Sequence, residues 1–191
     1  MKSISERACI LVLAAALGAC SSTGGGRDAG DGVDVARFHL GEPVARAQIS
    51  IEPFDKADAG RPEYPAHANA VERQLTRLGW TVVRTPGTSE QVALIDVEQG
   101  SRDAIAALSA ARIGRGMAAP MPSGDDGNVI ATLLEVAIRR RSDGTVFWEG
   151  RAVAEDIPGK PSADAAVMVE KLVEALFRDF PGESGRTIRI R

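Results

Sequence analysis

Alternation of apolar and polar side chains predicts a long β-hairpin in the second half of the chain. Residues 130–138 place an apolar side chain or a threonine at every second position, and residues 146–155 continue the run after a turn at 142–144. A period of two is typical of a strand with one buried face, and Gly144 suits the positive φ of a tight turn. We expect Trp148 to be the large inward anchor of this hairpin.

Five shorter segments are also predicted to be strands. In one of them Ile49 and Ile51 alternate with polar neighbours, and Pro53 ends the run. The segments at residues 80–84 and 92–98 are joined by a turn-rich link too short for a crossover helix, so we expect them to form an antiparallel pair. The five segments are residues 35–40, 47–54, 80–84, 92–98 and 187–191.

Helical spacing of apolar residues predicts a first helix that begins near Ala66. Val71, Leu75 and Leu78 fall on one stripe, and charged residues lie on the other side. Gly79 follows at the position where a helix commonly stops.

A second helix is predicted after Pro161. Ser162 is the expected cap, Asp164 lies in the first turn, and Pro181 marks the end. Its apolar stripe consists of Val169, Leu172, Val173, Leu176 and Phe180.

Two segments between the strands are less regular. Residues 104–112 are rich in alanine, which favours a short helix, but Ile105 and Leu108 alone give it little to bury, so its state stays open. Residues 114–128 contain glycines, prolines and methionines and are predicted to be a mobile loop. Together the elements predict an α+β fold, an antiparallel sheet with two amphipathic helices packed on one face.

The first twenty residues have the layout of an export signal. Lys2 and Arg7 supply positive charge, residues 8–17 are almost all apolar, and small residues lead to Cys20. This run is well below the roughly 20 apolar residues that a membrane-spanning helix needs. An ordinary secretory signal favours a small residue three places before the cut, and Leu17 stands there, so a lipoprotein cleavage site fits better.

Cys20 is therefore predicted to be the lipidation site. A cysteine sulfur can take a diacylglyceryl group, and cleavage frees an amino group for a further chain such as palmitate, so that several chains anchor the protein stably. Ser21 stands where an aspartate would favour the inner membrane, so the periplasmic face of the outer membrane is expected. The predicted organisation is a signal peptide at 1–19, a flexible tether at 20–34 and one domain at 35–191.

Charge and cysteine content narrow the function. The formal net charge is −3, and loss of the signal makes it −4, because Lys2, Glu6 and Arg7 together carry +1. A mildly acidic surface argues against a nucleic-acid partner. Cys9 leaves with the signal and Cys20 is acylated, which excludes a disulfide, thiol catalysis and cysteine metal sites from the mature domain.

The rest of the sequence contains no recognisable pattern of catalytic residues. His39 and His67 are isolated in the sequence and are expected to be surface or capping residues rather than ligands. No Gly-x-Ser-x-Gly segment and no phosphate-binding loop occurs. We therefore predict that the protein is not an enzyme and uses no cofactor and no metal.

Two charged clusters leave alternatives open. Asp125, Asp126 and Asn128 offer oxygen ligands for calcium, but a solvated acidic turn is the favoured interpretation because a complete calcium loop is missing. The arginines at 139–141 could contact anionic lipid headgroups. A solvated strand end is favoured, with Glu149 and Glu155 on the returning strand offsetting the charge.

Several short motifs together resemble the domain of unknown function 4136 family of bacterial envelope lipoproteins. They are Leu78-Gly79-Trp80, Trp148-Glu149-Gly150-Arg151-Ala152 and Phe180-Pro181, in addition to the lipoprotein signal. The likeness covers most of residues 35–181, although Ile49 to Phe54 lack the Tyr and Trp that many members carry. The resemblance implies an envelope location and an α+β fold but no reaction.

The sequence thus predicts a non-enzymatic envelope lipoprotein, anchored at Cys20, whose domain binds or assembles with another envelope component. The alternative is a carrier or sensor of a small apolar or lipid-like ligand held between sheet and helices. Methionines at 117 and 121 in the predicted mobile loop would suit adaptable apolar contacts in that case.

Overall fold

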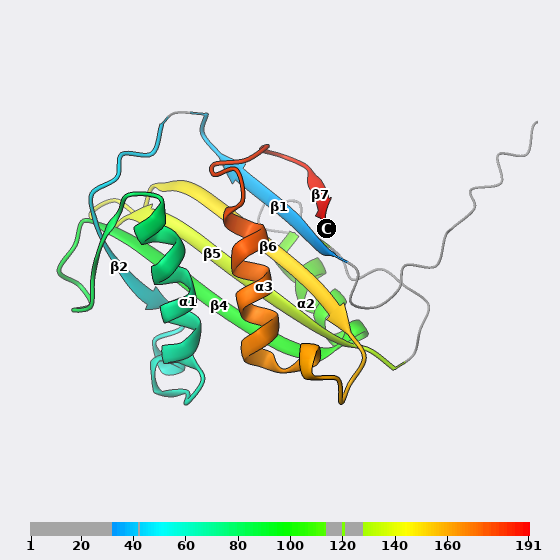
Figure 1. Ribbon diagram of the computed structural model, residues 1–191. Helices are drawn as coiled ribbons and strands as arrows, with labels where there is room; N and C mark the ends of the chain where they lie inside the picture. Colours follow the sequence, from blue (N-terminus) through cyan, green and yellow to red (C-terminus); the bar gives the residue numbers. More distant parts are fainter. Residues whose placement is uncertain (1–31, 42, 114–119, 121–127) are drawn as a thin grey trace, which may run out of the picture.

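A computed structural model shows a mixed α and β fold around one seven-stranded sheet (Figure 1). It describes residues 32–41, 43–113, 120 and 128–191. Cys20 and most of the 114–128 segment, including Asp125 and Asp126, lie outside these ranges. The strand order is β3-β2-β4-β5-β6-β1-β7.

The strands lie close to the predicted segments. The long hairpin is confirmed, with its turn at Gly144 in the positive-φ region, and the last strand pairs with the first. The first strand begins at Val33, two residues before the expected domain boundary. The bounds are β1 (Val33–His39), β2 (Gln48–Pro53), β3 (Thr81–Val83), β4 (Gln91–Ser101), β5 (Ile130–Arg140), β6 (Val146–Asp156) and β7 (Thr187–Ile190).

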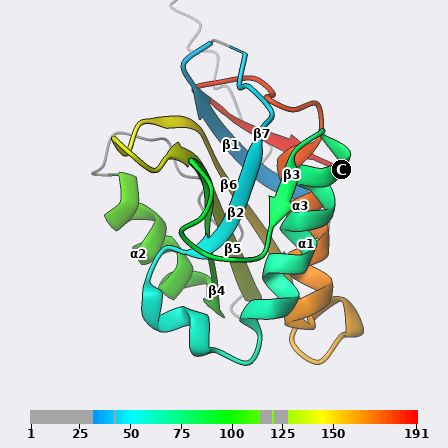
Figure 2. The same ribbon diagram turned by 90° about the vertical axis from the view of Figure 1, so that its left-hand side faces the viewer.

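Helices cover both faces of this sheet. The two predicted helices, α1 (Tyr64–Arg77) and α3 (Ala165–Phe177), lie side by side on one face. A third helix, α2 (Arg102–Ile113), lies on the opposite face, as the edge-on view in Figure 2 shows. Two 3₁₀ turns, η1 (Lys56–Gly60) and η2 (Pro161–Ala163), precede α1 and α3.

The main core lies between the sheet and the helices α1 and α3. Trp148 is fully buried there, as predicted, and stacks on Phe177 with ring centroids 5.3 Å apart. Its Nε1 donates a hydrogen bond of 2.9 Å to the carbonyl of Pro181. A Cβ on Gly150 would lie 2.5 Å from the Trp148 ring, so the glycine makes room for it.

Residues 104–112, whose secondary structure the sequence left undecided, lie within helix α2. Ile105 is buried and Leu108 half-buried against a small second cluster with Ala131, Leu133 and Val153. Strands β5 and β6 therefore bury side chains on both faces in this region, which the alternating pattern did not indicate.

The predicted antiparallel pairing of the third and fourth strands is wrong. Strand β2 lies between β3 and β4 and pairs with both in parallel, so the sheet is mixed rather than wholly antiparallel. The link at residues 84–90 crosses over β2 as a loop, and the N–H of Gly87 donates to the Glu52 carboxylate on the way. Strand β3 ends opposite Ser50 and β4 begins opposite Ile49, so the link only has to cross the width of β2 and needs no helix to run back along the sheet.

The predicted cap of the last helix is also wrong. Ser162 lies in η2, and Asp164 is the N-cap of α3, where its carboxylate accepts a 2.9 Å hydrogen bond from the Ala166 N–H. Aspartate is the better cap because its charge also complements the positive end of the helix dipole. Phe180 lies beyond the helix but still packs against Trp148.

Candidate functional site

A cleft of about 490 Å³ opens at the edge of the sheet beside β2, and we call it the β2 cleft. Strands β2 and β3, the turn η1 and the first half of α1 form most of its walls. Its lining residues are Ile51, Glu52, Pro53, Phe54, Lys56, Ala59, Tyr64, Pro65, Ala68, Asn69, Glu72, Val82, Val83, Arg84, Pro86, Leu94 and Arg139.

The cleft exists because β3 stops before β2 does. Strand β3 ends at Val83, opposite Ser50, so Ile51 and Pro53 continue without an outer neighbour among the described strands. The Ile51 carbonyl accepts a 3.4 Å hydrogen bond from the Tyr64 hydroxyl. Proline has no N–H, so Pro53 adds no donor to this edge.

The lining reaches round the sheet edge to its other face. Ile95 and Ile138 belong to the core under α1 and α3. Successive side chains of a strand point to opposite faces, so their neighbours Leu94 and Arg139 leave the sheet on the face that carries α2. The β2 cleft thus has side chains of α1 on one side of the sheet edge and, on the other, the apolar Leu94 and the charged Arg139.

Glu52 is held as a carboxylate at the cleft. It accepts hydrogen bonds from the Arg141 guanidinium at 2.5 Å, the Ser50 hydroxyl at 2.8 Å and the Gly87 N–H at 2.9 Å. Burial pushes the pKa of Glu52 upward, but these hydrogen bonds outweigh it and lower the pKa to about 2. Nearby, burial and the charge of Glu52 raise the pKa of Tyr64 to about 12.

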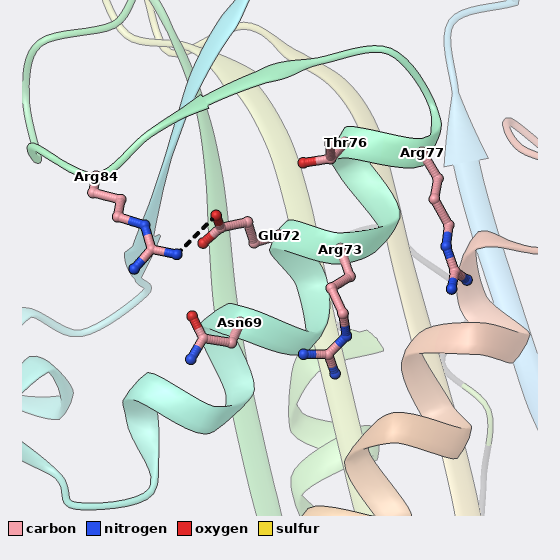
Figure 3. A pocket seen from close by; sticks show the side chains of 6 residues that line it. All are labelled: Asn69, Glu72, Arg73, Thr76, Arg77 and Arg84. Carbon is pink, nitrogen blue, oxygen red and sulfur yellow. Dashed lines mark hydrogen bonds and ion pairs between the residues drawn. The ribbon is translucent and has the colours of Figure 1, made fainter.

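An ion pair divides the β2 cleft from a shallow polar groove along α1. Arg84 donates to Glu72 at 3.0 Å across this boundary, with Asn69 one turn below, as Figure 3 shows. The groove has a volume of about 510 Å³ and continues past Arg73 and Arg77. Arg73 is tied to Glu170 of α3 by an ion pair.

The two histidines lie outside the residues that line the cleft, and His39 has hydrogen-bonding partners. His39 Nδ1 accepts from the Gly41 N–H, and Nε2 lies 3.1 Å from the Gly182 carbonyl. His67 is 8% exposed on α1, which corrects the expectation of a surface position. Burial lowers the pKa of His67.

The three arginines predicted to form one solvated cluster have separate environments. Arg141 binds Glu52, Arg140 binds Asp143 at 2.7 Å, and Arg139 lines the β2 cleft. The expected offset by acidic residues of β6 is wrong. Glu149 pairs with Arg151, and Glu155 pairs with Arg102, because these positions lie opposite Ala137 and Ala131 rather than at the arginine end of β5.

A buried charge cluster occupies the α2 face of the central strands. Arg151 is 2% exposed, and its Nη2 donates to Glu135 at 3.2 Å and to Glu149 at 2.9 Å. Burial raises the pKa of Glu149, against the attraction of Arg151. The sequence did not indicate this cluster, because Glu135 and Arg151 fall at the outward positions of the alternating strand pattern. Charged residues at such positions are normally exposed to solvent.

Other predicted ligands are not brought together. Asn128 is exposed, while its proposed calcium partners lie outside the described residues. Within the described ranges, no group of three or more His, Cys, Asp or Glu side chains is arranged to hold a metal ion. In the same ranges no helix combines the length and the apolar character needed to cross a membrane.

Comparisons with known proteins find distant similarity. No protein-family model matches the chain. An uncharacterized protein of Zymomonas mobilis subsp. mobilis is 23% identical over 212 aligned positions, which cover 83% of this chain and 80% of the relative. The resemblance to the domain of unknown function 4136 family stays a prediction.

Two solved structures are distantly similar to this chain. The PelC dodecamer from Paraburkholderia phytofirmans has a TM-score of 0.42 and 14% identity and covers 76% of this chain and 96% of its own. A PDZ domain protein from Parabacteroides distasonis has a TM-score of 0.48 and 11% identity and covers 83% of this chain and 39% of its own. At this level the similarity carries no functional argument.

Proposed function

We propose that the chain is a bacterial envelope lipoprotein, anchored by lipid at Cys20 on the periplasmic face of the outer membrane, with a non-enzymatic binding domain. The signal layout of residues 1–20 supports the anchor. The β2 cleft carries the binding part of the proposal. Its volume of about 490 Å³ lies within the roughly 300–1,000 Å³ that is typical of small-molecule sites.

The side chains of the cleft favour binding over catalysis. Among the described residues that line it, none is Ser, Thr, Cys or His. Glu52 is bound to Arg141, and Glu72 is bound to Arg84, so both carboxylates already have cationic partners. Lys56 and Tyr64 also line the cleft, but no described residue activates Lys56, and burial raises the pKa of Tyr64 to about 12. An enzyme site would require a nucleophile or base within reach of its activating partner.

A small ligand suits the cleft better than an extended peptide. A peptide that adds a strand to a sheet needs alternating donors and acceptors on the exposed edge. The open stretch of β2 contains Pro53, which has no N–H to donate. These features support the alternative of a carrier or sensor of a small apolar or lipid-like molecule.

Native mass spectrometry of the full chain, purified from its own envelope, tests this proposal. We expect an added mass on the native protein, and its loss in Ala68→Trp, because the indole would fill the cleft that Ala68 lines. Ala66→Trp places the same indole on an exposed position of α1 outside the lining and should keep the added mass. A native protein that is always free of ligand would overturn the proposal.

A protein partner in the envelope is the second candidate. Strand β7 pairs with β1 and ends the sheet, so the described strands leave its outer edge open. A photocrosslinking residue at Thr187 should capture one specific envelope protein, whereas the same residue at exposed Val167 of α3 should not. Equal capture at both positions, or none at Thr187, would count against this candidate.

A further inference from the structure

The charges of the β2 cleft are unequally matched. Glu52 and Glu72 are its two carboxylates, and each already binds an arginine. Lys56 and Arg139 also line the cleft, and no ion pair joins either of them to a described residue. The uncommitted charges in the cleft are therefore both positive.

Arg139 has an unmet hydrogen-bonding group as well. Its Nε is buried and has no acceptor among the described residues. A buried donor without an acceptor costs about 1–3 kcal/mol, and more when it is charged. Because Nε itself is closed to solvent, the unpaired positive charge of the guanidinium, rather than Nε, is what Arg139 offers to a ligand in the cleft.

The other side chains that line the β2 cleft favour an apolar group on the ligand. Ile51, Val82, Ala68 and Leu94 line it with aliphatic side chains, and Pro65 adds a further apolar wall. A hydrocarbon chain needs no hydrogen-bond partners and gains about 25 cal/mol for each Å² of apolar surface buried. An apolar body and an anionic end together match what the cleft presents.

We propose that the β2 cleft binds an amphipathic anion, a single apolar chain that ends in a carboxylate or phosphate, with the headgroup against Lys56 and Arg139. This inference rests on the proposed binding function of the cleft and names the chemical class of its ligand. Arg139 supplies a planar set of donors that suits carboxylate and phosphate oxygens. Lys56 supplies a second cation from η1.

Isothermal titration calorimetry of the full chain with matched probes tests the chemistry. The probes are dodecanoate, dodecyl phosphate, dodecyltrimethylammonium, dodecanol, inorganic phosphate and adenosine monophosphate, each below its aggregation concentration. We expect either anionic dodecyl probe to bind at least about tenfold more tightly than the cationic or neutral one, which corresponds to one charged hydrogen bond. The stronger anion identifies the headgroup, carboxylate or phosphate.

Variants connect the affinity to the two cations. Arg139→Gln and Lys56→Gln should each weaken binding of the preferred anion about tenfold and leave dodecanol unchanged. Arg61→Gln removes an exposed cation that follows η1 and lies outside the cleft lining, so its affinity should match that of the native protein. Lys56 is exposed, so Lys56→Gln keeps the test valid even if Arg139→Gln fails to fold.

Three results would overturn the inference. Equal affinity for dodecanol and dodecanoate, with both blocked by Ala68→Trp, would leave a binding cleft but remove the anionic preference. If inorganic phosphate or adenosine monophosphate bound as tightly as dodecyl phosphate, the apolar chain would not contribute to binding. Absence of binding to every probe would also overturn it, while the native mass spectrum of the envelope-purified protein would decide the proposed function separately.

Discussion

At the residue scale, a single buried arginine completes the end of α3. Arg37 is 3% exposed and donates to the carbonyls of Leu176 at 2.8 Å, Ala175 at 2.8 Å and Arg178 at 3.1 Å. The last carbonyls of a helix have no partner within it. A guanidinium supplied by β1 satisfies them and ties the first strand to the last helix.

Arg37→Met removes this cap and keeps the apolar stem. We expect the free energy of unfolding to fall by about 2–4 kcal/mol, because buried carbonyls lose charged donors. Urea unfolding would measure the change, with Arg61→Met, at an exposed position, expected within about 0.5 kcal/mol of the native protein. A cost as small as that of the control would show that the carbonyls find other donors.

Gly150→Ala tests the space reserved for Trp148. The added Cβ would lie 2.5 Å from the indole and 2.7 Å from Leu176, so the core must shift. Overpacking of this kind costs about 1–3 kcal/mol. Thermal unfolding should show a lower Tm, whereas Gly60→Ala, which meets no atom within 4 Å, should change it little. Equal Tm values for both variants would contradict the packing described here.

The lowered pKa of Glu52 predicts how the stability of the fold depends on pH. Its pKa in the folded protein is about 2, against an ordinary value of 4.5. A lowered pKa means that the ionised carboxylate stabilises the fold above about pH 4.5 and that this contribution is lost as the pH falls toward 2. Urea unfolding at pH 5.5 and pH 3 should therefore show a smaller loss in Glu52→Gln than in the native protein.

A matched control separates this effect from general acid destabilisation. Glu183→Gln removes a carboxylate of an exposed ion pair with Arg186, so it should lose stability in parallel with the native protein. If Glu52→Gln also lost stability in parallel, the contacts from Arg141, Ser50 and Gly87 would not be stabilising in solution.

At the element scale, local patterns predicted the elements better than their partners. The β5–β6 hairpin follows from alternation and one glycine turn, both of which act between neighbouring residues. The position of β2 between β3 and β4 depends on contacts between distant segments, so a link of suitable length was not enough to assign the pairing. Helix α2 stayed ambiguous because Ile105 and Leu108, on which its assignment depended, gain stability only from the sheet beneath them.

Helix α2 should be the least protected of the three helices. Its apolar packing is a small cluster around Ile105 and Leu108, while α3 lies over the main core. Hydrogen exchange measured by mass spectrometry should show faster exchange in α2 than in α3. Ile105→Ala should speed exchange in α2 further and leave α3 unchanged, and equal acceleration in both helices would show that they open as one unit.

At the scale of the whole molecule, the candidate site is assembled from distant parts of the chain. Glu52, Tyr64, Arg84 and Arg139 belong to four separate elements or links and meet only at the β2 edge. No spacing rule connects such residues, so the sequence indicated a binding role without locating it. Pro65 at the start of α1 is the lining residue nearest to a local signal, because a proline is typical of the first turn of a helix.

Lipid attachment at Cys20 is the claim on which the proposed function depends most, because it would place the cleft at a membrane surface. Membrane fractionation of native protein and Cys20→Ser, each followed by intact mass, tests it directly. We predict that the native protein stays with the membranes, starts at an acylated Cys20 and lacks residues 1–19, while Cys20→Ser loses the acyl mass and its membrane attachment. Equal membrane retention of both proteins, or an unacylated native protein that keeps residues 1–19, would contradict the account.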